Sequence, residues 1–339
     1  ILAEPQRTNL IPYSEDFSQW SPINSTILSD NTTSPDGTVN ADRITSTSTG
    51  DSAFVRNTQS TQTVSTVYSY SCFVKKGTTD FVRLANRSLG NVSEASCWFD
   101  IQNGVVGDVG SNVSSTEIES FGDGWYKCTV IGTTGGTIST QLTDIAAATS
   151  NGNTSATTGD YIYYWGAQLE VGSYATSYIP TSGSTVTRNQ DIFTRDGIGS
   201  LINSTEGVLF VEMAALSNDG TNKRISLSNG SNSYRIVISY STSNNIQIFI
   251  VGAPAGTFAP SKSIDITLNS KIAVSWSSTE ARFYVDGSPI LVTSGDFSYT
   301  ASTLSELKTS DGAGGSDFYG KVKQLQVYDT SLSDTQLAA

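Results

Sequence analysis

The sequence contains no histidine in 339 residues. This absence excludes Ser-His-Asp and Cys-His nucleophilic machinery, histidine general bases and histidine-ligated metal sites. Hydrolysis by a pair of carboxylates and elimination by lysine or tyrosine remain open, but the sequence singles out no such group of residues. We therefore expect that the chain is not an enzyme.

Cysteine is also scarce, with three residues in the whole chain. Cys72, Cys97 and Cys128 each lie in a strand-like context, and their odd number and wide spacing argue against a disulfide framework or a zinc site. We expect them to be small hydrophobic side chains of the core.

Charge is sparse as well. Charged residues make up 15% of the sequence, and 19 basic residues leave a net charge of −12. Because the basic residues are scattered, we expect no nucleic-acid partner. We find no signal peptide and no apolar run of spanning length, so we expect no membrane insertion. Since the sequence starts at Ile1, we expect a processed form or a piece of a longer chain.

Short β-rich runs separated by turn residues fill the sequence. Val64–Lys75 alternates over its full length, and Asn103-Gly104 and Asp286-Gly287 are hairpin signals. A single helical turn is expected, at Ser331–Ala338. The pattern predicts an all-β protein of two antiparallel β-sandwich (jelly-roll) domains in tandem.

The division into two domains is inferred from the stretch Tyr161–Pro180, YIYYWGAQLEVGSYATSYIP. We interpret Tyr161–Leu169 as the closing strand of a first domain, and we expect Asn9–Trp20 to cover its free edge. The polar segment after Pro180 then marks the boundary. We predict a first domain at residues 1–185, a linker at 186–206 and a second domain at 207–339.

Several sequence segments of the first domain occur together in a known family. The segments ILAEPQRTNLIPYSEDFSQW, SPDGTVNADRI, GDGWYKC and YIYYWGAQLEVGSYATSYIPT resemble, in this order, a domain of bacteriophage virion proteins, the head spike fibres and tail fibres. The same frame is similar to the jelly roll of carbohydrate-binding modules. The resemblance implies a virion surface protein, a homotrimer, other virion proteins as partners and a role in attachment to cell-surface glycans.

Residues 207–339 resemble the concanavalin A-like (laminin G-like) lectin fold. The resemblance is found in two sequence segments, KIAVSWSSTEARFYVDGSPI and FYGKVKQLQVYDTSLSDTQLAA. The fold hosts lectins, enzymes and structural domains, so it implies an architecture more than a function.

Sugar rings bind to exposed aromatic side chains that are flanked by amides and carboxylates. One such group in the first domain is the candidate glycan site: Tyr161, Tyr163, Tyr164, Trp165 and Gln168. The alternative is that these rings belong to the core and cover a sheet face.

No cofactor is required by this interpretation, but the resemblances imply sites for a structural calcium ion. In the first domain Asp16 and Glu170 are the candidate ligands, where the first and last strands meet. In the second domain the candidates are Asp286, Asp311 and Asp317, which could instead form turns.

Two other functions remain open. The chain could be a non-catalytic carbohydrate-binding region of a secreted polysaccharide-degrading enzyme, or a purely structural capsid decoration protein. The sequence does not name the sugar, the host or a position on the head or tail of a virion.

Overall fold

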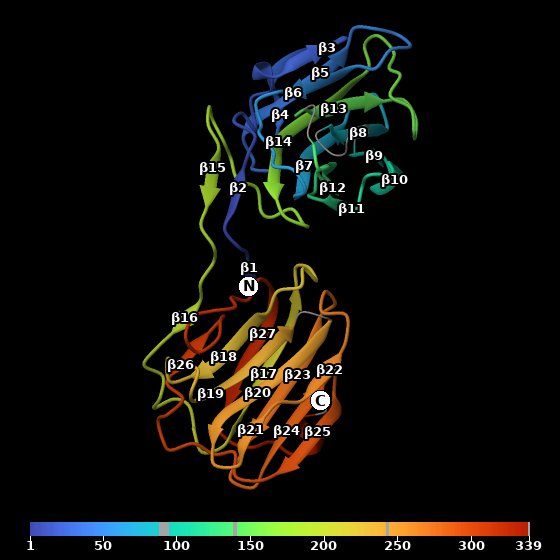
Figure 1. The fold of residues 1–339 in the computed structure, drawn as a ribbon. Coiled ribbons are helices and arrows are strands. Elements are labelled where there is room, and N and C mark those ends of the chain that lie inside the picture. The colour runs from blue at the N-terminus through green and yellow to red at the C-terminus, as the bar shows by residue number, and fades with distance from the viewer. Residues whose placement is uncertain (88–94, 138–140, 242–243, 338–339) are drawn as a thin grey trace. The chain divides into compact units, whose positions relative to one another are not determined.

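The structure is a computed structural model that describes residues 1–87, 95–137, 141–241 and 244–337. The chain forms two compact units (Figure 1). The N-terminal unit is Gln6–Asn189, and the C-terminal unit is Gln190–Ala339 together with Ile1–Pro5. Within the described ranges, every helix is too short or too polar to cross a membrane.

Two antiparallel sheets form the N-terminal unit among the described residues. The first has the order β10 (Val105–Val109), β9 (Ala95–Asp100), β8 (Phe81–Asn86), β13 (Thr143–Ala148), β6 (Phe54–Asn57) and β3 (Ser21–Ile23). The second has the order β11 (Ser115–Ser120), β12 (Trp125–Thr133), β7 (Val67–Lys76), β14 (Tyr161–Val171), β5 (Val39–Ser46) and β4 (Ser25–Thr33). A short ribbon of β2 (Arg7–Asn9) with β15 (Val186–Arg188), and the 3₁₀ helix η1 (Phe17–Gln19), complete the unit.

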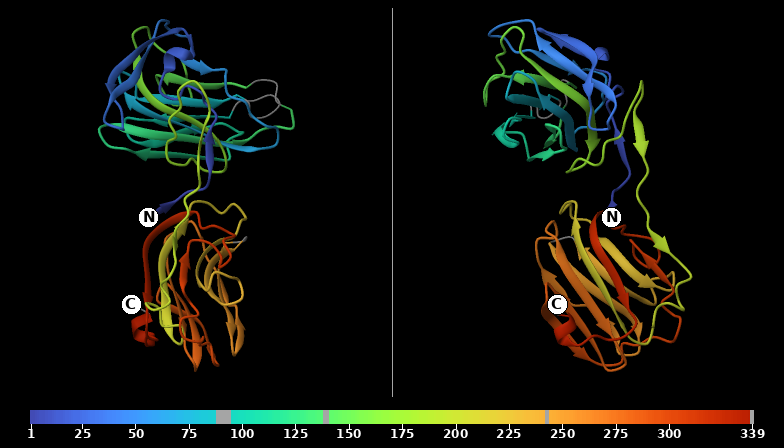
Figure 2. Two further views of the ribbon diagram at one scale, coloured as in Figure 1. Left: turned by 90° about the vertical axis from the view of Figure 1, so that its left-hand side faces the viewer. Right: turned by 180° about the vertical axis from the view of Figure 1, so that it is seen from behind.

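The C-terminal unit also has two antiparallel sheets, which Figure 2 shows as two layers. One has the order β1 (Leu2–Ala3), β27 (Gly320–Tyr328), β17 (Gly207–Ala215), β23 (Ser270–Trp276), β24 (Glu280–Val285) and β25 (Ser288–Ser294). The other has the order β16 (Thr194–Arg195), β26 (Glu306–Lys308), β18 (Lys223–Ser228), β19 (Arg235–Ser241), β20 (Asn245–Ala253) and β21 (Gly256–Phe258), with β22 (Ser261–Ser263) also on β20.

Each unit encloses its own hydrophobic core between its two sheets. In the C-terminal unit, Trp276 and Phe283 from one sheet pack with alternate isoleucines of β19 and β20 from the other. In the N-terminal unit, Tyr70 and Tyr164 pack with Leu84 and Phe99 of the opposite sheet. Period-two alternation places these residues inward, since successive side chains of a strand point to opposite faces. The predicted all-β class with antiparallel sandwiches is confirmed.

The helix α1 (Asp334–Leu337) lies within the expected Ser331–Ala338, of which residue 338 lies outside the described residues. Leu337 packs with Val208 and Tyr284 on the outer side of the sheet that contains β17 and β24.

The unit boundaries differ from the predicted ones. Residues 1–5, expected in the first domain, belong to the C-terminal unit because Leu2 and Ala3 of β1 pair with Lys321 and Gly320 of β27. The expected linker 186–206 is divided, since β15 pairs with β2 and β16 pairs with β26. Strands of two or three residues leave no periodic pattern, but they satisfy backbone groups at open sheet edges.

The closing strand β14 has more partners than Asn9–Trp20 alone. It lies between β5 and β7 in the middle of its sheet. Its pairing with β7 shifts after Trp165, where Gly166 has a φ of +62°. From the start of the chain, Leu10 N donates to Leu169 O at 2.8 Å, and Ala167 N donates to Ser14 O at 2.8 Å. The expected contact with Asn9–Trp20 therefore forms after the bulge at Gly166, whereas β5 pairs with the part of β14 that precedes the bulge.

Candidate functional site

The aromatic side chains of β14 lie on both faces of the strand. Tyr164 is fully buried in the core between the two sheets. Tyr163 and Trp165 point to the other face of the sheet, where they form a second aromatic cluster with Phe73. The YIYYW run is therefore divided between two environments, as the alternation of a strand requires.

The outer aromatic cluster is covered by the chain that follows β14. Tyr178 packs on Trp165 with ring centroids 4.6 Å apart, and Phe73 packs on Trp165 at 5.2 Å. Trp165 keeps 4% of its surface exposed. A ring in this position has no free face for a sugar, so Trp165 and Tyr164 are not the exposed platform that the sequence suggested.

Gln168 is buried by the same covering segment. Its side chain accepts a hydrogen bond from Ile179 N at 2.7 Å and donates to Thr176 O at 3.4 Å. The amide therefore holds the residues after β14 against the sheet. Tyr161 and Tyr163 stay half-buried and stack edge to face at 5.5 Å, so only these two of the five expected residues present part of a ring at the surface.

The two acids expected to hold calcium in the N-terminal unit accept hydrogen bonds from backbone N–H groups instead. Asp16 is exposed and caps η1 by accepting from Ser18 N at 3.1 Å. Glu170 is buried and accepts from Thr176 N at 2.9 Å, which anchors the segment that covers Trp165.

In the C-terminal unit, the three candidate acids are likewise engaged. Asp286 lies in the turn after β24 and accepts from Lys271 N at 2.8 Å. Asp317 lies 3.3 Å from the hydroxyl of Tyr319. Asp311 accepts from the backbone of its own loop and pairs with Arg224. In the part of the chain that the structure describes, no three acidic or cysteine side chains are grouped so that they could hold a metal.

A polar hollow of ≈ 450 Å³ lies beside η1 and is lined by Glu15, Asp16, Asp30, Asn40 and Asp42, among others. Asp42 is buried and accepts from Phe17 N and Asp30 N, both at 3.0 Å. Burial raises the pKa of Asp42 to about 6, and the nearby carboxylates of Asp30 and Asp16 add to the rise. The acids of this hollow are therefore crowded, and the buried one is held by backbone donors.

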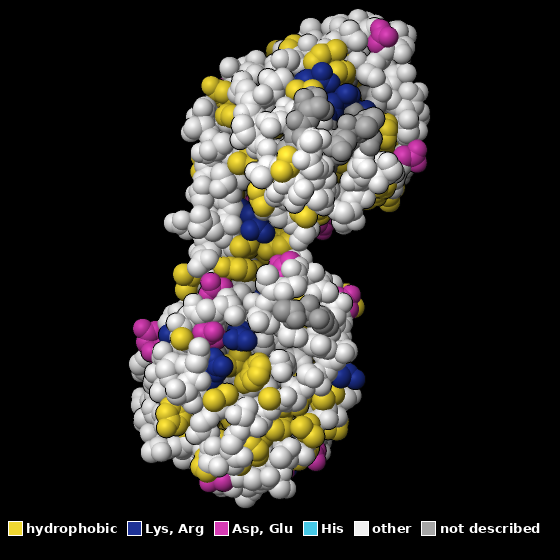
Figure 3. Space-filling view, in the orientation of Figure 1, with side chains coloured by type: hydrophobic (Ala, Val, Ile, Leu, Met, Phe, Trp, Pro, Cys, Tyr) yellow, Lys and Arg dark blue, Asp and Glu magenta, His cyan; other side chains and the backbone are white. Residues whose placement is uncertain are grey.

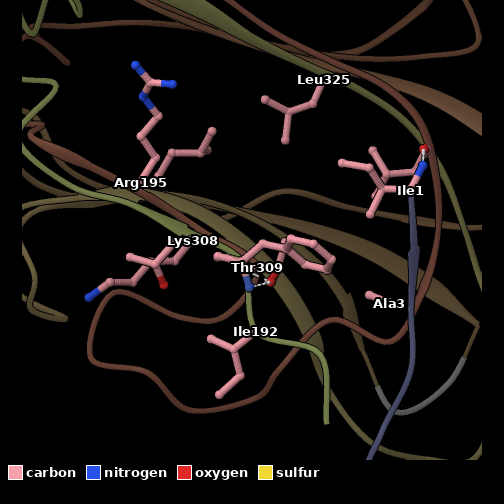
Figure 4. Close-up of a pocket in the computed structure, with 11 residues that line it drawn as sticks. Ile1, Ala3, Ile192, Arg195, Lys308, Thr309 and Leu325 are labelled. Atoms are coloured by element: carbon pink, nitrogen blue, oxygen red, sulfur yellow. Dashed lines mark hydrogen bonds between the residues drawn. The ribbon is translucent and has the colours of Figure 1, made fainter.

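An apolar hollow of ≈ 440 Å³ opens at the edge of the C-terminal sandwich, between β1 and β16 (Figure 4). Its walls include Ile192, Phe193, Leu307 and Leu325. Figure 4 shows that Arg195 extends its guanidinium away from Ile1 and Ala3. The hollow thus offers mainly hydrophobic contact, with Thr194, Lys308 and Thr309 also in its lining.

The outer face of β18, β19 and β20 has a different composition. Their inward residues are the core isoleucines, leucine and tyrosine, so the alternate residues point outward. We call this surface the serine–arginine face and define it by its members: Arg224, Ser226, Ser228, Arg235, Val237, Ser239, Gln247, Phe249 and Val251.

Strand register fixes how these residues neighbour one another. Ser226, Val237 and Phe249 form one row across the three strands, because Ser226 pairs with Val237 and Val237 pairs with Phe249. Arg224, Ser239 and Gln247 form a second row, and Ser228, Arg235 and Val251 form a third. The three serines and Val237 are buried, so the accessible members of the face are Arg224, Arg235, Gln247, Phe249 and Val251.

Arg224 reaches across the middle strand of this face. Its guanidinium carbon lies 5.8 Å from the centroid of the Phe249 ring, although Phe249 belongs to β20 and Arg224 to β18. Its Nη1 also lies 3.4 Å from Asp311 Oδ2. Asp311 is held in turn by Ala313 N at 3.0 Å and Gly315 N at 2.8 Å. The 310–317 loop therefore positions one arginine over the apolar centre.

Arg235 carries a positive charge that no acid neutralises at close range in the described ranges. Its Nη1 donates to Asn232. Burial lowers the pKa of Arg235, and the neighbouring charge of Arg224 lowers it further, whereas Asp311 opposes both. Lys308, on the adjacent β26, pairs with Glu306 at 2.6 Å. Arg224 and Lys308 thus each have an acid partner, and Arg235 has none among the described residues.

Among the residues that the structure describes, three buried polar atoms on this face have no hydrogen-bond partner: Arg224 Nε, Ser226 Oγ and Arg235 Nε. Buried polar atoms are almost always hydrogen-bonded, so a group of unpaired ones on a single surface needs an explanation. Figure 3 shows dark blue basic side chains beside hydrophobic ones over β18 and β19. This combination suits a ligand that offers both an apolar ring face and hydrogen-bonding oxygens.

The sequence did not single out this face. Arg224 and Arg235 are separated by the rest of β18 and a turn, and serine is common throughout the chain. Only the alternation within β18, β19 and β20 could have grouped these side chains, and it does not give the register that aligns them.

The family comparison concerns the C-terminal unit. Residues 209–338 match the family model of the concanavalin A-like lectin/glucanases superfamily. A search of curated proteins finds no match to the chain.

Several solved structures are similar in fold. The CBM40 of the Ruminococcus gnavus IT-sialidase bound to α2,3-sialyllactose has a TM-score of 0.36 and 12% identity, with 41% of this chain and 84% of that chain covered. The NanB sialidase from Streptococcus pneumoniae has a TM-score of 0.34 and 13% identity, with 43% and 26% covered. The binding domain of Botulinum neurotoxin DC, in complex with rat synaptotagmin II, has a TM-score of 0.34 and 11% identity, with 44% and 39% covered. The part of the chain from residue 209 to residue 338 is therefore similar to concanavalin A-like lectins and glucanases.

Proposed function

We propose that this chain is a glycan-binding protein and that the serine–arginine face is its binding surface. The observation that carries the proposal is the partly exposed ring of Phe249, with Gln247 and Val251 beside it on β20 and the guanidinium of Arg224 5.8 Å from its centroid. The match of residues 209–338 to a superfamily that includes lectins supports it.

The chemistry of a sugar fits this surface. A pyranose ring presents C–H groups on its faces and hydroxyl groups at its edge, so it binds where an apolar patch adjoins hydrogen-bonding side chains. Phe249 and Val251 supply the patch. The partly exposed side chains of Arg224, Arg235 and Gln247 supply hydrogen-bonding groups beside it.

We propose binding without catalysis and without a required metal. The acids next to the face, Glu306 and Asp311, are each paired with a basic side chain. A carboxylate held in this way is a poor general acid or base, because its partner occupies its oxygens and fixes its position.

A glycan-array screen of the full chain tests the proposal, with Phe249→Ala as the diagnostic variant and Tyr328→Ala as the control. Tyr328 is 38% exposed and lies on β27 of the opposite sheet. We expect the full chain and Tyr328→Ala to retain the same glycans and Phe249→Ala to lose them. Retention by Phe249→Ala would place the binding surface elsewhere, and a blank array for the unaltered chain would refute glycan binding. The screen is repeated with EDTA, and loss of binding there would contradict metal independence.

A second, more specific proposal concerns where the protein acts. We infer a homotrimeric virion surface protein of a bacteriophage, with a role in host attachment, from the resemblance of residues 1–185 stated above. Antibodies against the purified chain should label intact phage particles in electron microscopy, and light scattering should give three times the mass of one chain, which is 36.0 kDa. A monomer that retains polysaccharide would favour a module of a polysaccharide-degrading enzyme. An oligomer that binds virion proteins but no glycan would favour a structural decoration protein.

A further inference from the structure

We propose a second carbohydrate site, on the N-terminal unit, that takes one neutral pyranose ring in a hollow beside Phe121. The hollow has a volume of ≈ 430 Å³ and is lined by residues of the segments 32–37 and 121–123. Lys75 and Trp125, which pair across β7 and β12, complete the lining. The site shares no residue with the serine–arginine face, which belongs to the C-terminal unit.

An exposed aromatic ring is part of this hollow. Phe121 is 46% exposed and packs edge to face on Phe73, with ring centroids 4.8 Å apart. The ring is therefore held by packing and still open to solvent, so it can stack on the C–H face of a sugar. Trp165 lacks this freedom, because Phe73 and Tyr178 both pack on it.

Polar side chains with unused hydrogen-bonding capacity stand beside the ring. Within the described ranges, four side chains of the lining make no hydrogen bond or ion pair: Thr32, Thr33, Lys75 and Asp123. Thr33 and Asp123 are exposed, and Thr32 and Lys75 are half-buried. Sugar hydroxyls both donate and accept hydrogen bonds, so they can use the carboxylate, the ammonium and the threonine hydroxyls together.

The charges of the hollow favour a neutral ligand. Lys75 contributes one positive charge, with its Nζ 5.9 Å from the centroid of the Trp125 ring, and Asp123 contributes one negative charge. A charged ligand would be attracted by one of these groups and repelled by the other. Neighbouring hydroxyls of an uncharged ring can donate to Asp123 and accept from Lys75 without leaving a net charge.

Hydrogen bonds fix both sides of the hollow in the absence of a ligand. Trp125 Nε1 donates to Thr33 O at 3.1 Å, which ties β12 to the end of β4. Phe121 N donates to Trp125 O at 2.9 Å, and Trp125 N donates to Gly122 O at 2.8 Å, which closes the turn that carries Asp123. A preformed site of this kind loses little conformational entropy on binding. Its volume also lies within the range of about 300–1,000 Å³ that small-molecule sites have.

Saturation-transfer difference NMR on the full chain tests the site, with the methyl glycosides of glucose, galactose, mannose and N-acetylglucosamine as probes. One ring in an open hollow should bind with a dissociation constant of about 1 mM, which the washes of an array would remove but NMR detects in solution. We expect Phe249→Ala, which lacks the proposed binding ring of the other unit, to bind at least one glycoside. No binding of any probe at about 10 mM would overturn the second site and leave the serine–arginine face untouched.

Two variants separate the hollow from the fold. Phe121→Ala should lose the glycoside, whereas Phe193→Ala, which removes a 39% exposed phenylalanine of the C-terminal unit, is the matched control and should bind normally. Asp123→Asn should weaken binding about tenfold through loss of a charge-assisted hydrogen bond. This variant keeps the turn, because asparagine tolerates the φ of +48° at this position. Normal binding by Phe121→Ala would refute the site, and normal binding by Asp123→Asn would refute the role of the carboxylate.

A charged probe tests the neutral class. Methyl glucuronide is compared with methyl glucoside on the unaltered chain, and we expect it to bind no more tightly, because Asp123 opposes the attraction of Lys75. Binding of the glucuronide about tenfold more tightly than the glucoside would overturn the neutral class. Thermal unfolding of Phe121→Ala and Asp123→Asn accompanies these measurements, so that a lost signal is ascribed to the site only in a folded variant.

Discussion

Asn9 accepts a hydrogen bond at 3.1 Å from the backbone N–H of Leu169, which lies 160 residues later in the chain. Its side-chain oxygen also accepts from Ile11 N at 3.1 Å, and its side-chain nitrogen donates to Ala167 O and Ile179 O. Asn9 is fully buried. One amide thus satisfies backbone groups on the edge of β14 that β5 leaves uncovered after Tyr164.

Asn9→Ala should therefore destabilise the N-terminal unit. The substitution leaves buried backbone groups of Leu169, Ala167 and Ile179 without a partner, and each such group costs about 1–3 kcal/mol. We expect the free energy of unfolding in urea to fall by about 3 kcal/mol. Asn31→Ala, at an exposed position of β4, is the control and should change little. A loss below about 0.5 kcal/mol for Asn9→Ala would contradict the bonding role of the amide.

Trp165→Ala should also act on stability, because its ring packs between Phe73 and Tyr178. Removal of a buried tryptophan costs about 3–5 kcal/mol. Tyr161→Ala, at a half-buried ring, should cost much less. Thermal unfolding and the glycan array, measured together on both variants, separate packing from binding. A Trp165→Ala variant of normal stability that loses a glycan would restore Trp165 as a binding platform.

Asp42 should make the N-terminal unit less stable as the pH rises from about 4 to about 6. The native pKa of Asp42 is raised to about 6 from the ordinary value of 3.8, so between these values the native state binds more protons than the unfolded state. The free energy of unfolding then falls with increasing pH across this window. Above about pH 6, Asp42 causes no further change.

Urea unfolding of Asp42→Asn at several pH values checks this expectation. The variant should lose the decrease between pH 4 and pH 6, although it should be less stable overall, because an amide oxygen can replace only one of the two acceptors used by Phe17 N and Asp30 N. Asp123→Asn, at an exposed turn, should keep the slope of the unaltered chain. An identical slope in Asp42→Asn would show that other groups cause the pH dependence.

The three cysteines should be unreactive in the native protein. Cys72, Cys97 and Cys128 are buried as free thiols, and burial raises the pKa of each, to about 11 for Cys97. Thiolate is the reactive form, so little reacts at pH 8. Ellman's reagent should detect almost no thiol in the native chain and three per chain in guanidinium. Rapid reaction of any thiol in the native state would contradict its burial.

The alternation of apolar and polar residues, the turn dipeptides and the absence of helical periodicity together determined the all-β class and the presence of two sandwiches. These signals are local, because a strand's side chains point to opposite faces whatever the strand pairs with. The same locality explains why Cys72, Cys97 and Cys128 were correctly expected in the core.

Tertiary structure alone decided what covers each face. Trp165 and Gln168 have the pattern of a binding surface, but the segment around Tyr178 lies on them. Arg224 and Phe249 come from strands that are not neighbours, and only the register of β18, β19 and β20 brings them together. Pairing across tens of residues depends on the shape of the whole sheet, whereas inward or outward direction depends on the strand alone.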